Sequence, residues 1–351
     1  MKKIALLLLF ASLILAGCQD KKAEVPASKK EFYTGTYAEL TFYGKDKKVA
    51  IDEAYKTINK LVTQIETNEQ GESEIDKVNK NAGKTPVKVS ANVYDLVERS
   101  IKTAEETNGE FDPAIGGATS LWHIGFADAG KPSETDLEKI KKLLDYKKIK
   151  MDKAKSTIFL EEKGMKIDLG GVGKGWLAQS VMEGLKKKEI TRGIINFGGH
   201  VFTYNGKGQT STPSWSIKMG DPSLVKSDTT EALAPIATVE STSSSFVMTS
   251  MYARYLLVGN KVYSHLIDQK TARPYDNDLT AVYVMGEDPV QVDLLSNALY
   301  GMGCVKGLEY VNAHKEIDAV FALENKELHV SKGFKGKIVL EKGSEFKLVN
   351  E

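Results

Sequence analysis

The stretch Asp168-Leu169-Gly170-Gly171-Val172-Gly173-Lys174-Gly175 decides how the sequence is interpreted. Met165-Lys166-Ile167 before it is typical of a strand end, and apolar residues recur at helical spacing from Trp176 to Leu185 after it. Glycine lets a backbone approach a ligand closely, and the free N–H groups of a first helical turn attract anions. With Lys174 beside them, this strand, loop and helix predict a site for a phosphate-bearing ligand. The spacing matches neither the P-loop nor the dinucleotide fingerprint, so an ordinary glycine-rich turn remains the alternative on this pattern alone.

Other motifs accompany the loop along the chain. Phe111-Asp112-Pro113-Ala114-Ile115-Gly116 precedes it, and Ser264-His265-Leu266-Ile267-Asp268 and Asp293-Leu-Leu-Ser-Asn297 follow it. This ordered set resembles the FAD:protein FMN transferases, the ApbE family, from about Tyr33 to about Gly303. The resemblance implies a single large two-lobed domain. It also implies an enzyme that transfers FMN from FAD to a Thr or Ser hydroxyl of an acceptor flavoprotein and releases AMP.

The element pattern independently favours an α+β fold. Helical and strand patterns alternate irregularly, which argues against a doubly wound parallel sheet. Side chains suited to capping precede two of the helices, at Ser90 and Ser133. The predicted helices include 49–65, 91–108, 134–144 and 289–301, and the predicted strands include 36–43, 148–151, 157–161, 193–197, 200–204, 253–258, 261–267 and 279–285.

The N-terminus predicts a lipoprotein signal peptide over residues 1–17. A basic start and a short apolar run lead to Leu15-Ala16-Gly17-Cys18, which resembles a bacterial lipobox. We expect Cys18 to be lipidated and to anchor the protein to the cell membrane on its extracytoplasmic side; a plain cleaved signal is the alternative. Residues 18–32 are polar and predict a flexible tether, and the transferase domain is expected over 33–345.

Charge and cysteine content exclude two classes of site. The formal net charge is +1, and no basic surface for nucleic acid is expected. Cys18 and Cys304 are the two cysteines, so a thiolate metal site and an intrachain disulfide in the lipidated protein are not expected. The apolar helical setting of Cys304 predicts a buried, inert thiol.

A magnesium site is predicted around Asp293. Asp293 and Asn297 lie four residues apart on one predicted helix, so their side chains face the same way. Carboxylate and amide oxygens suit a hard cation such as Mg²⁺, although an ordinary polar helix face is the alternative. The resemblance adds the backbone carbonyl of Gly171 as a third ligand, and Asn297 departs from the threonine usual there.

His265 is the predicted general base. Histidine is the side chain that titrates near neutrality when unperturbed, and the resemblance places the base in the Ser-His-x-Ile-Asp motif. With a pKa near 6.5, its protonation would slow the reaction at about pH 6–7. The other histidines carry only a surface or packing interpretation; they are His123, His200, His314 and His329.

The resemblance also implies contacts with FAD. A simple turn remains the alternative for Asp112-Pro113, and a cap for Asp168. Two family features are altered. The family's Met-Gly-Thr is replaced by Thr34-Gly35-Thr36, and the turn over residues 68–72 lacks the tyrosine that the family has there. The implied FAD contacts are Phe111, Asp112, Pro113, Asp168, Lys174, Arg254 and Ile267.

Three other functions compete with FMN transfer. An enzyme of the same fold could hydrolyse FAD to FMN and AMP. A flavin-binding lipoprotein without catalysis is compatible with the altered N-terminal motifs. A substrate-binding lipoprotein of an importer fits the lipobox but accounts for neither His265 nor Asp293.

Overall fold

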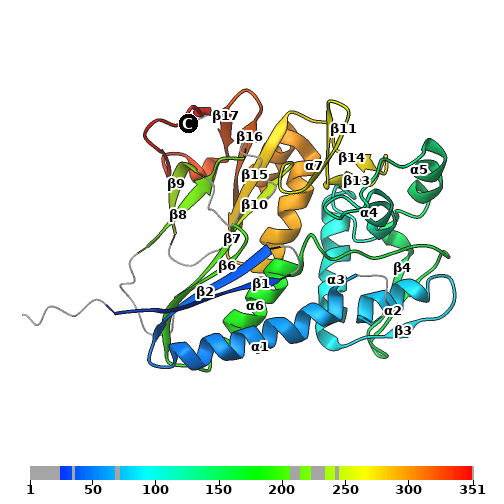
Figure 1. Cartoon of the computed structure of the whole chain (residues 1–351), viewed down its shortest axis with the longest axis horizontal. Coiled ribbons are helices and arrows are strands. Elements are labelled where there is room, and N and C mark those ends of the chain that lie inside the picture. The colour runs from blue at the N-terminus through cyan, green and yellow to red at the C-terminus, as the bar shows by residue number, and fades with distance from the viewer. Residues whose placement is uncertain are drawn as a thin grey trace, which may run out of the picture.

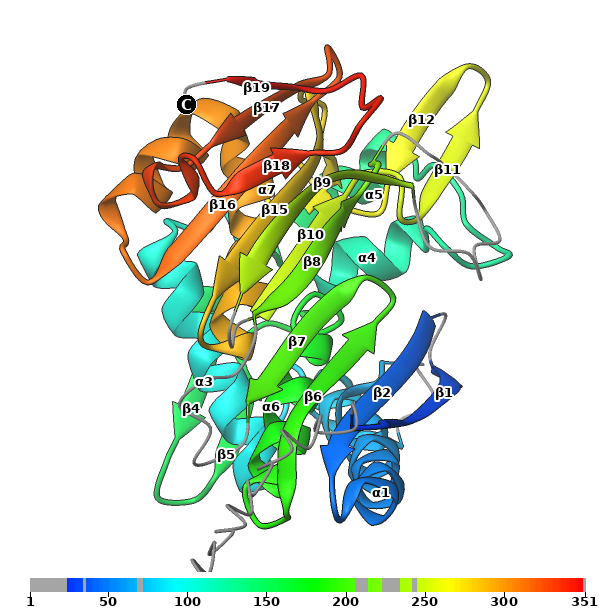
Figure 2. The same ribbon diagram turned by 90° about the vertical axis from the view of Figure 1, so that its left-hand side faces the viewer.

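A nine-stranded sheet forms the centre of the molecule. The computed structural model describes residues 24–33, 36–67, 72–205, 214–222, 234–241 and 245–349. The strand order is β1-β2-β6-β7-β10-β15-β16-β17-β19, and all neighbours are antiparallel except β17 and β19 (Figure 2). The strands are β1 (Ala27–Tyr33), β2 (Thr36–Gly44), β6 (Ile190–Phe197), β7 (His200–Asn205), β10 (Ser245–Ser250), β15 (Leu279–Gly286), β16 (Ile317–Leu323), β17 (Glu327–Val330) and β19 (Lys347–Val349).

Three helices cover one face of this sheet (Figure 1). They are α1 (Lys47–Ile65), α6 (Gly173–Leu185) and α7 (Pro289–Ala313), and α6 packs between the other two. The other face is covered by a small sheet of β8 (Trp215–Gly220), β9 (Pro235–Ser241) and β18 (Ile338–Leu340).

Central strand β15 shows why both faces are buried. Val282 and Val284 enter the core beneath the helices, whereas Ala281 and Tyr283 enter the core beneath the small sheet. An apolar strand without alternation is expected when both faces are covered.

A second group of elements packs beside α1 and α7. Capping hydroxyls start three of its helices: Ser73, Ser90 and Ser133 each accept a hydrogen bond from the backbone N–H three residues on. The group consists of α2 (Glu74–Lys80), α3 (Ala91–Glu106), α4 (Gly116–Trp122), α5 (Glu134–Lys141), β3 (Val87–Lys88), β4 (Ile149–Asp152), β5 (Thr157–Leu160), the hairpin of β11 (Tyr255–Val258) and β12 (Lys261–Ser264), and the short pair β13 (Ile267–Asp268) and β14 (Arg273–Pro274).

The predicted α+β domain is confirmed, and three local predictions are wrong. Residues 165–167 are not a strand; Lys166 makes only an isolated bridge to Ile115, because no continuous partner runs beside it. The predicted tether is too long, since residues 27–33 form β1 on β2. An edge strand keeps much of its surface in water, so its composition resembles that of a linker. Helix α7 continues past residue 301 to Ala313, across a kink at Gly303 with φ of 76°.

Candidate functional site

Asp168 ties the glycine loop to two other segments. Its Oδ1 accepts the N–H of Gly170 at 2.8 Å, and its Oδ2 accepts the hydroxyl of Thr119 at 2.7 Å. Its own N–H donates to the carbonyl of Pro113 at 3.0 Å. Both carboxylate oxygens therefore make hydrogen bonds within the protein. A contact between Asp168 and FAD stays a prediction. The sequence pattern did not single out Thr119.

Gly175 lets helices α6 and α7 touch. A Cβ at this position would lie 2.2 Å from the carbonyl oxygen of Pro289 and 2.9 Å from the Cβ of Asp293. The Gly175 N–H donates to Oδ2 of Asp293 at 2.8 Å. One of the N–H groups that could attract an anion at the start of α6 is thus already used by a carboxylate of this chain.

The three expected metal ligands lie together. The amide nitrogen of Asn297 donates to the carbonyl of Gly171 at 2.8 Å and to the carbonyl of Asp293 at 2.9 Å. Oδ1 of Asp293 is buried and has no hydrogen-bond partner. This oxygen and the carbonyl oxygen of Gly171 suit a hard cation such as Mg²⁺. Asn297 would add its side-chain oxygen if its amide group were rotated by 180°.

Oxygen donors outside the acidic side chains would have to complete such a site. In the described part of the chain, no group of three or more His, Cys, Asp or Glu side chains could hold a metal ion. A cation at Asp293 would therefore depend on backbone, amide or substrate oxygens.

His265 directly follows strand β12 and contacts the backbone carbonyl of Arg254. Its Nδ1 lies 3.1 Å from the carbonyl oxygen of Arg254, which also accepts the backbone N–H of His265 at 3.1 Å. Since a carbonyl can only accept, Nδ1 carries the hydrogen in the neutral ring, and Nε2 keeps its lone pair. This is the tautomer that a general base requires.

The electrostatic environment keeps His265 neutral. Burial lowers the pKa of His265 to about 3, with further lowering by the charges of Arg254 and Lys174, against the opposing hydrogen bond to the Arg254 carbonyl. This low pKa argues against a loss of activity at about pH 6–7 from protonation of this residue. The main cause is burial of the imidazole, and the positive charges of Arg254 and Lys174 add to it.

Lys174 and Arg254 form an electropositive pair beside this base. Burial lowers the pKa of Lys174, Asp293 opposes the shift, and Arg254 adds to it. Burial also lowers the pKa of Arg254, opposed by the charge of Asp168. Lys174 of the glycine loop therefore lies close to Arg254, which precedes β11, and to Asp293 of α7.

Arg254 lies directly over Gly125. A Cβ at Gly125 would lie 2.7 Å from Cδ of Arg254, and Gly125 has a φ of +101°. A side chain there would both strain the backbone and displace the guanidinium. Gly125 therefore helps to set the position of Arg254.

The remaining predicted FAD contacts are buried side chains. Phe111, Asp112, Pro113 and Ile267 are all buried in the protein. The Asp112 carboxylate accepts the N–H groups of Ala114 at 2.7 Å and of Tyr146 at 3.1 Å. Burial raises the pKa of Asp112 to about 6, although both hydrogen bonds act against the shift. Contacts between these four side chains and FAD stay predictions.

His200 is a site residue that the sequence analysis missed. It starts β7 after the Gly198-Gly199 turn, and its Nδ1 lies 3.3 Å from Oδ1 of Asp293. Burial, followed by the charge of Lys174, lowers its pKa, although Asp293 acts against the shift. No sequence spacing connects residues 200 and 293, because strand and helix meet only in the tertiary structure.

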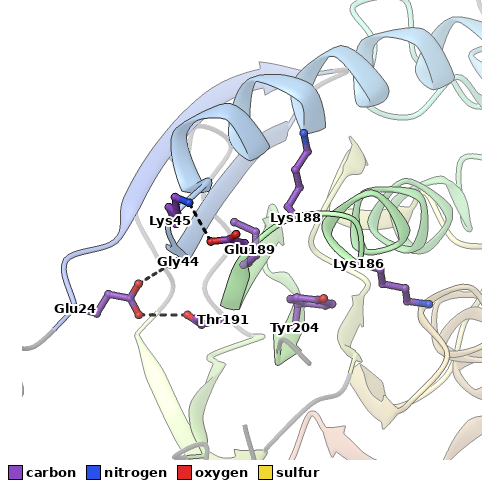
Figure 3. Close-up of a pocket in the computed structure, with 9 residues that line it drawn as sticks. Glu24, Gly44, Lys45, Lys186, Lys188, Glu189, Thr191 and Tyr204 are labelled. Carbon is purple, nitrogen blue, oxygen red and sulfur yellow. Dashed lines mark hydrogen bonds and ion pairs between the residues drawn. The ribbon is translucent and has the colours of Figure 1, made fainter. Parts of the chain in front are cut away.

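Two cavities lie at different distances from this chemistry. The cavity of about 490 Å³ in Figure 3, lined by residues such as Glu24, Lys45 and Tyr204, contains none of the predicted site residues. The other, of about 240 Å³, is lined by Gly116, Thr119 and Ile167 among others, and so adjoins the carboxylate of Asp168. Of these two cavities, the smaller one therefore lies against the residue that hydrogen-bonds Asp168.

Two further features concern the cysteines and the membrane. Cys304 is partly exposed, so the prediction of full burial is wrong, but desolvation raises the pKa of its thiol to about 11. Its thiolate is correspondingly scarce at neutral pH. Cys18, the signal peptide and most of the altered N-terminal motifs lie outside the described residues. Within the described part, no helix is long and apolar enough to cross a membrane.

Comparison with known proteins identifies the family. The model of the ApbE family matches residues 34–321. This chain therefore belongs to the ApbE family.

Individual relatives match over most of their length. An FAD:protein FMN transferase of Klebsiella pneumoniae is 28% identical over 292 residues, covering 83% of this chain and 87% of the relative. One of Treponema pallidum is 26% identical over 325 residues, covering 89% and 88%.

Solved structures share the fold. The ApbE protein of Thermotoga maritima superposes with a TM-score of 0.79 at 22% identity, covering 89% of this chain and 99% of that chain. The flavin transferase ApbE of Vibrio cholerae gives a TM-score of 0.74 at 20% identity with the same coverage.

Proposed function

We propose that this chain is an FAD:protein FMN transferase that attaches FMN to a Thr or Ser hydroxyl of an acceptor flavoprotein. Relatives that carry this name match more than four fifths of the chain. The observation that carries the proposal is the neutral His265, with Nε2 free, beside the cationic pair Lys174 and Arg254. A base next to positive charge suits the transfer of a phosphoryl group to a hydroxyl.

The proposed reaction assigns a role to each of these groups. Nε2 of His265 takes the proton of the acceptor hydroxyl as its oxygen attacks the phosphorus of the FMN half of FAD. A phosphoester bond to the acceptor forms, and the bond between that phosphorus and the bridging oxygen breaks. AMP leaves with the bridging oxygen. Lys174 and Arg254 would hold the pyrophosphate and offset its charge.

FAD would lie along the glycine loop. The cavity of about 240 Å³ next to Thr119 can take only part of so large a molecule, so the rest must lie in the open part of the site. The Asp168 carboxylate supports this arrangement by holding the loop to α4.

Asp293, Asn297 and Gly171 would hold a divalent cation, with Mg²⁺ as the expected metal. When bound, the cation would neutralise charge on the phosphoryl oxygens and on the leaving AMP. We expect chelation to abolish FAD turnover. Asp293→Ala should reduce turnover far more than Asn297→Ala, because Asp293 also holds Gly175. Undiminished turnover by the native protein in chelator contradicts the metal requirement.

Mass analysis of the products tests the function directly. Purified protein lacking residues 1–17 is incubated with FAD, Mg²⁺ and a candidate acceptor. Transfer predicts an acceptor heavier by one FMN group and an equal amount of AMP. FMN and AMP without a modified acceptor would identify an FAD pyrophosphatase. Unchanged FAD across a panel of acceptors would identify a flavin-binding protein.

The proposed location is the extracytoplasmic face of the cell membrane, through a lipid on Cys18. The support is the lipobox at residues 15–18 and the apolar run before it. The acceptor flavoprotein would then be found in the same compartment.

A further inference from the structure

The β11–β12 hairpin connects the candidate base to an exposed strand. Among the described residues these two strands pair only with each other, and the hairpin stands to one side of the main sheet (Figure 2). Arg254 directly precedes β11, and His265 directly follows β12. The backbone N–H of His265 donates to the carbonyl of Arg254 at 3.1 Å, so both residues lie at the open end of the hairpin.

The backbone of β11 presents hydrogen-bonding groups at its outer edge. In an antiparallel ladder, hydrogen-bonded pairs alternate with pairs whose N–H and C=O groups point away from the partner strand. The bond from His265 to Arg254 marks one hydrogen-bonded pair. Counted along the register from that pair, Tyr255 and Leu257 belong to the outward-pointing kind. An edge of this type is a template for a further strand.

Large apolar side chains accompany this edge. Leu257 is 59% exposed and Val258 is 41% exposed. Phe126, which is 57% exposed, follows Gly125, and Gly125 packs against the side chain of Arg254. Exposed apolar groups on a strand edge favour association with another chain, so a surface of this kind beside the candidate base indicates a partner.

The other edge of the hairpin is less accessible. Ser264 at the end of β12 is 2% exposed, and its hydroxyl accepts the N–H of Leu266. The imidazole of His265 also lies toward β11, since its Nδ1 is 3.1 Å from the carbonyl oxygen of Arg254. A partner strand is therefore expected on β11.

We propose that β11 is the docking strand for the acceptor flavoprotein, and that an extended acceptor segment carrying the Thr or Ser pairs with its outer edge. The inference rests on the proposed function, because it concerns the second substrate of that same site. FMN transfer requires a protein hydroxyl to reach Nε2 of His265 in every turnover, which brings the acceptor to the open end of this hairpin; a second copy of this chain has no such requirement.

The dimensions of the strand fit this role. Leu257 is three residues from Arg254, which corresponds to about 10 Å along a strand. A segment paired over this length would lead its hydroxyl toward His265. Main-chain hydrogen bonds would supply affinity, and contact with Leu257 would select an apolar side chain in the acceptor.

Transfer kinetics test the contribution of Leu257. The probe is a synthetic peptide that spans the Thr or Ser found modified in the mass analysis, used with FAD and protein lacking residues 1–17. Leu257→Glu should raise the KM for the peptide roughly tenfold or more, because burial of a leucine against the peptide is lost. The affinity for FAD and kcat should stay nearly unchanged. Val339→Glu is the matched control, since Val339 is a 66% exposed residue of β18 in the small sheet, and its KM should match the wild type.

Amide hydrogen exchange followed by NMR tests the backbone pairing in the wild type, so misfolding of Leu257→Glu cannot leave the question open. Saturating peptide should slow exchange of the Tyr255 and Leu257 amides at least tenfold. The amide of Val262, which pairs with Leu257 and points away from β11, should exchange as before.

Three results overturn the docking strand and leave the proposed function intact. One is transfer with an unchanged peptide KM in Leu257→Glu, and another is unchanged exchange at both β11 amides. The third is a dimer that Leu257→Glu dissociates without a change in KM, which would assign the surface to a second copy. A wild-type protein that modifies no acceptor overturns the proposed function itself, and the docking strand with it.

Discussion

At the scale of single residues, the hydrogen bonds of the site determine what each group is free to do. Each carboxylate oxygen of Asp168 accepts one hydrogen bond, from Thr119 or Gly170, and each oxygen of Asp112 accepts one from a backbone N–H group. His265 retains a free lone pair because the Arg254 carbonyl takes its Nδ1 hydrogen. Asp293 retains one free oxygen. These are the two residues to which the proposed function assigns proton transfer and cation binding.

His265→Ala should retain FAD but lose FMN transfer by about 10²–10⁴-fold, the usual effect of removing a positioned base. Because the pKa of His265 is lowered to about 3, the imidazole is neutral over the whole range from pH 5 to 8. A base must be unprotonated to act, so its protonation should not slow the wild-type reaction in that range. FAD titration and transfer rates across pH on both proteins test this. Wild-type speed in the variant would show that another group is the base.

Lys174→Ala should weaken the binding of FAD and leave that of riboflavin nearly unchanged. The ammonium lies beside Arg254 at the loop, where it would face phosphates that riboflavin lacks. Fluorescence titration with both flavins measures the difference. Lys187→Ala, an exposed lysine beyond the other end of α6, is the control and should leave both affinities unchanged. Equal losses for FAD and riboflavin would instead indicate a structural role for Lys174.

At the scale of elements, the contact between α6 and α7 builds the site. Gly175→Ala should destabilise the protein by several kcal/mol, since its Cβ would lie 2.2 Å from the Pro289 carbonyl; overpacking typically costs about 1–3 kcal/mol and occasionally more. FAD turnover should fall with it, because Asp293 would lose its bond to Gly175.

Gly184→Ala on the same helix is the matched control for that substitution. No atom lies within 4 Å of a Cβ there, so alanine should be neutral, or stabilising by up to about 1 kcal/mol. Thermal unfolding of the two variants checks the pair. Similar melting temperatures for both would refute the close helix contact.

At the scale of the whole molecule, the beginning of the described chain lies on the main sheet. Glu24 accepts the N–H of Gly44 at 2.6 Å, and β1 then pairs with β2 (Figure 3). Cys18 is six residues earlier, so a lipid on it could be no more than about 20 Å from Glu24 along an extended chain. The predicted anchor would keep the domain close to the bilayer.

Cys18→Ser should leave the protein unlipidated and either uncleaved or mislocalised. A thioether to diacylglycerol requires the cysteine sulfur, which serine does not supply. Detergent partitioning and the intact mass of both forms measure the change. Cys304→Ser is the control and should partition like the wild type. A Cys18→Ser protein that still enters the detergent phase refutes the lipobox prediction.

Sequence alone determined the elements whose signals are local. The helix starting after Ser90, the strand over residues 36–43 and the loop before α6 follow from capping hydroxyls, periodicity and glycine spacing. The ordered motifs also indicated the family, and the family model that matches residues 34–321 confirms it. Strand β1 was missed, since lysines on an edge strand look like those of a linker.

Only the tertiary structure determined which groups meet. Asp293 lies 118 residues from Gly175 along the chain, and His265 owes its low pKa first to burial and then to the charges of Arg254 and Lys174. The sequence around His200 indicates only a strand residue. In the folded protein, Oδ1 of Asp293 on α7 lies 3.3 Å from its Nδ1. Burial and electrostatic fields depend on distances through space, and these are fixed by the packing of α6, α7 and the sheet rather than by spacing along the chain.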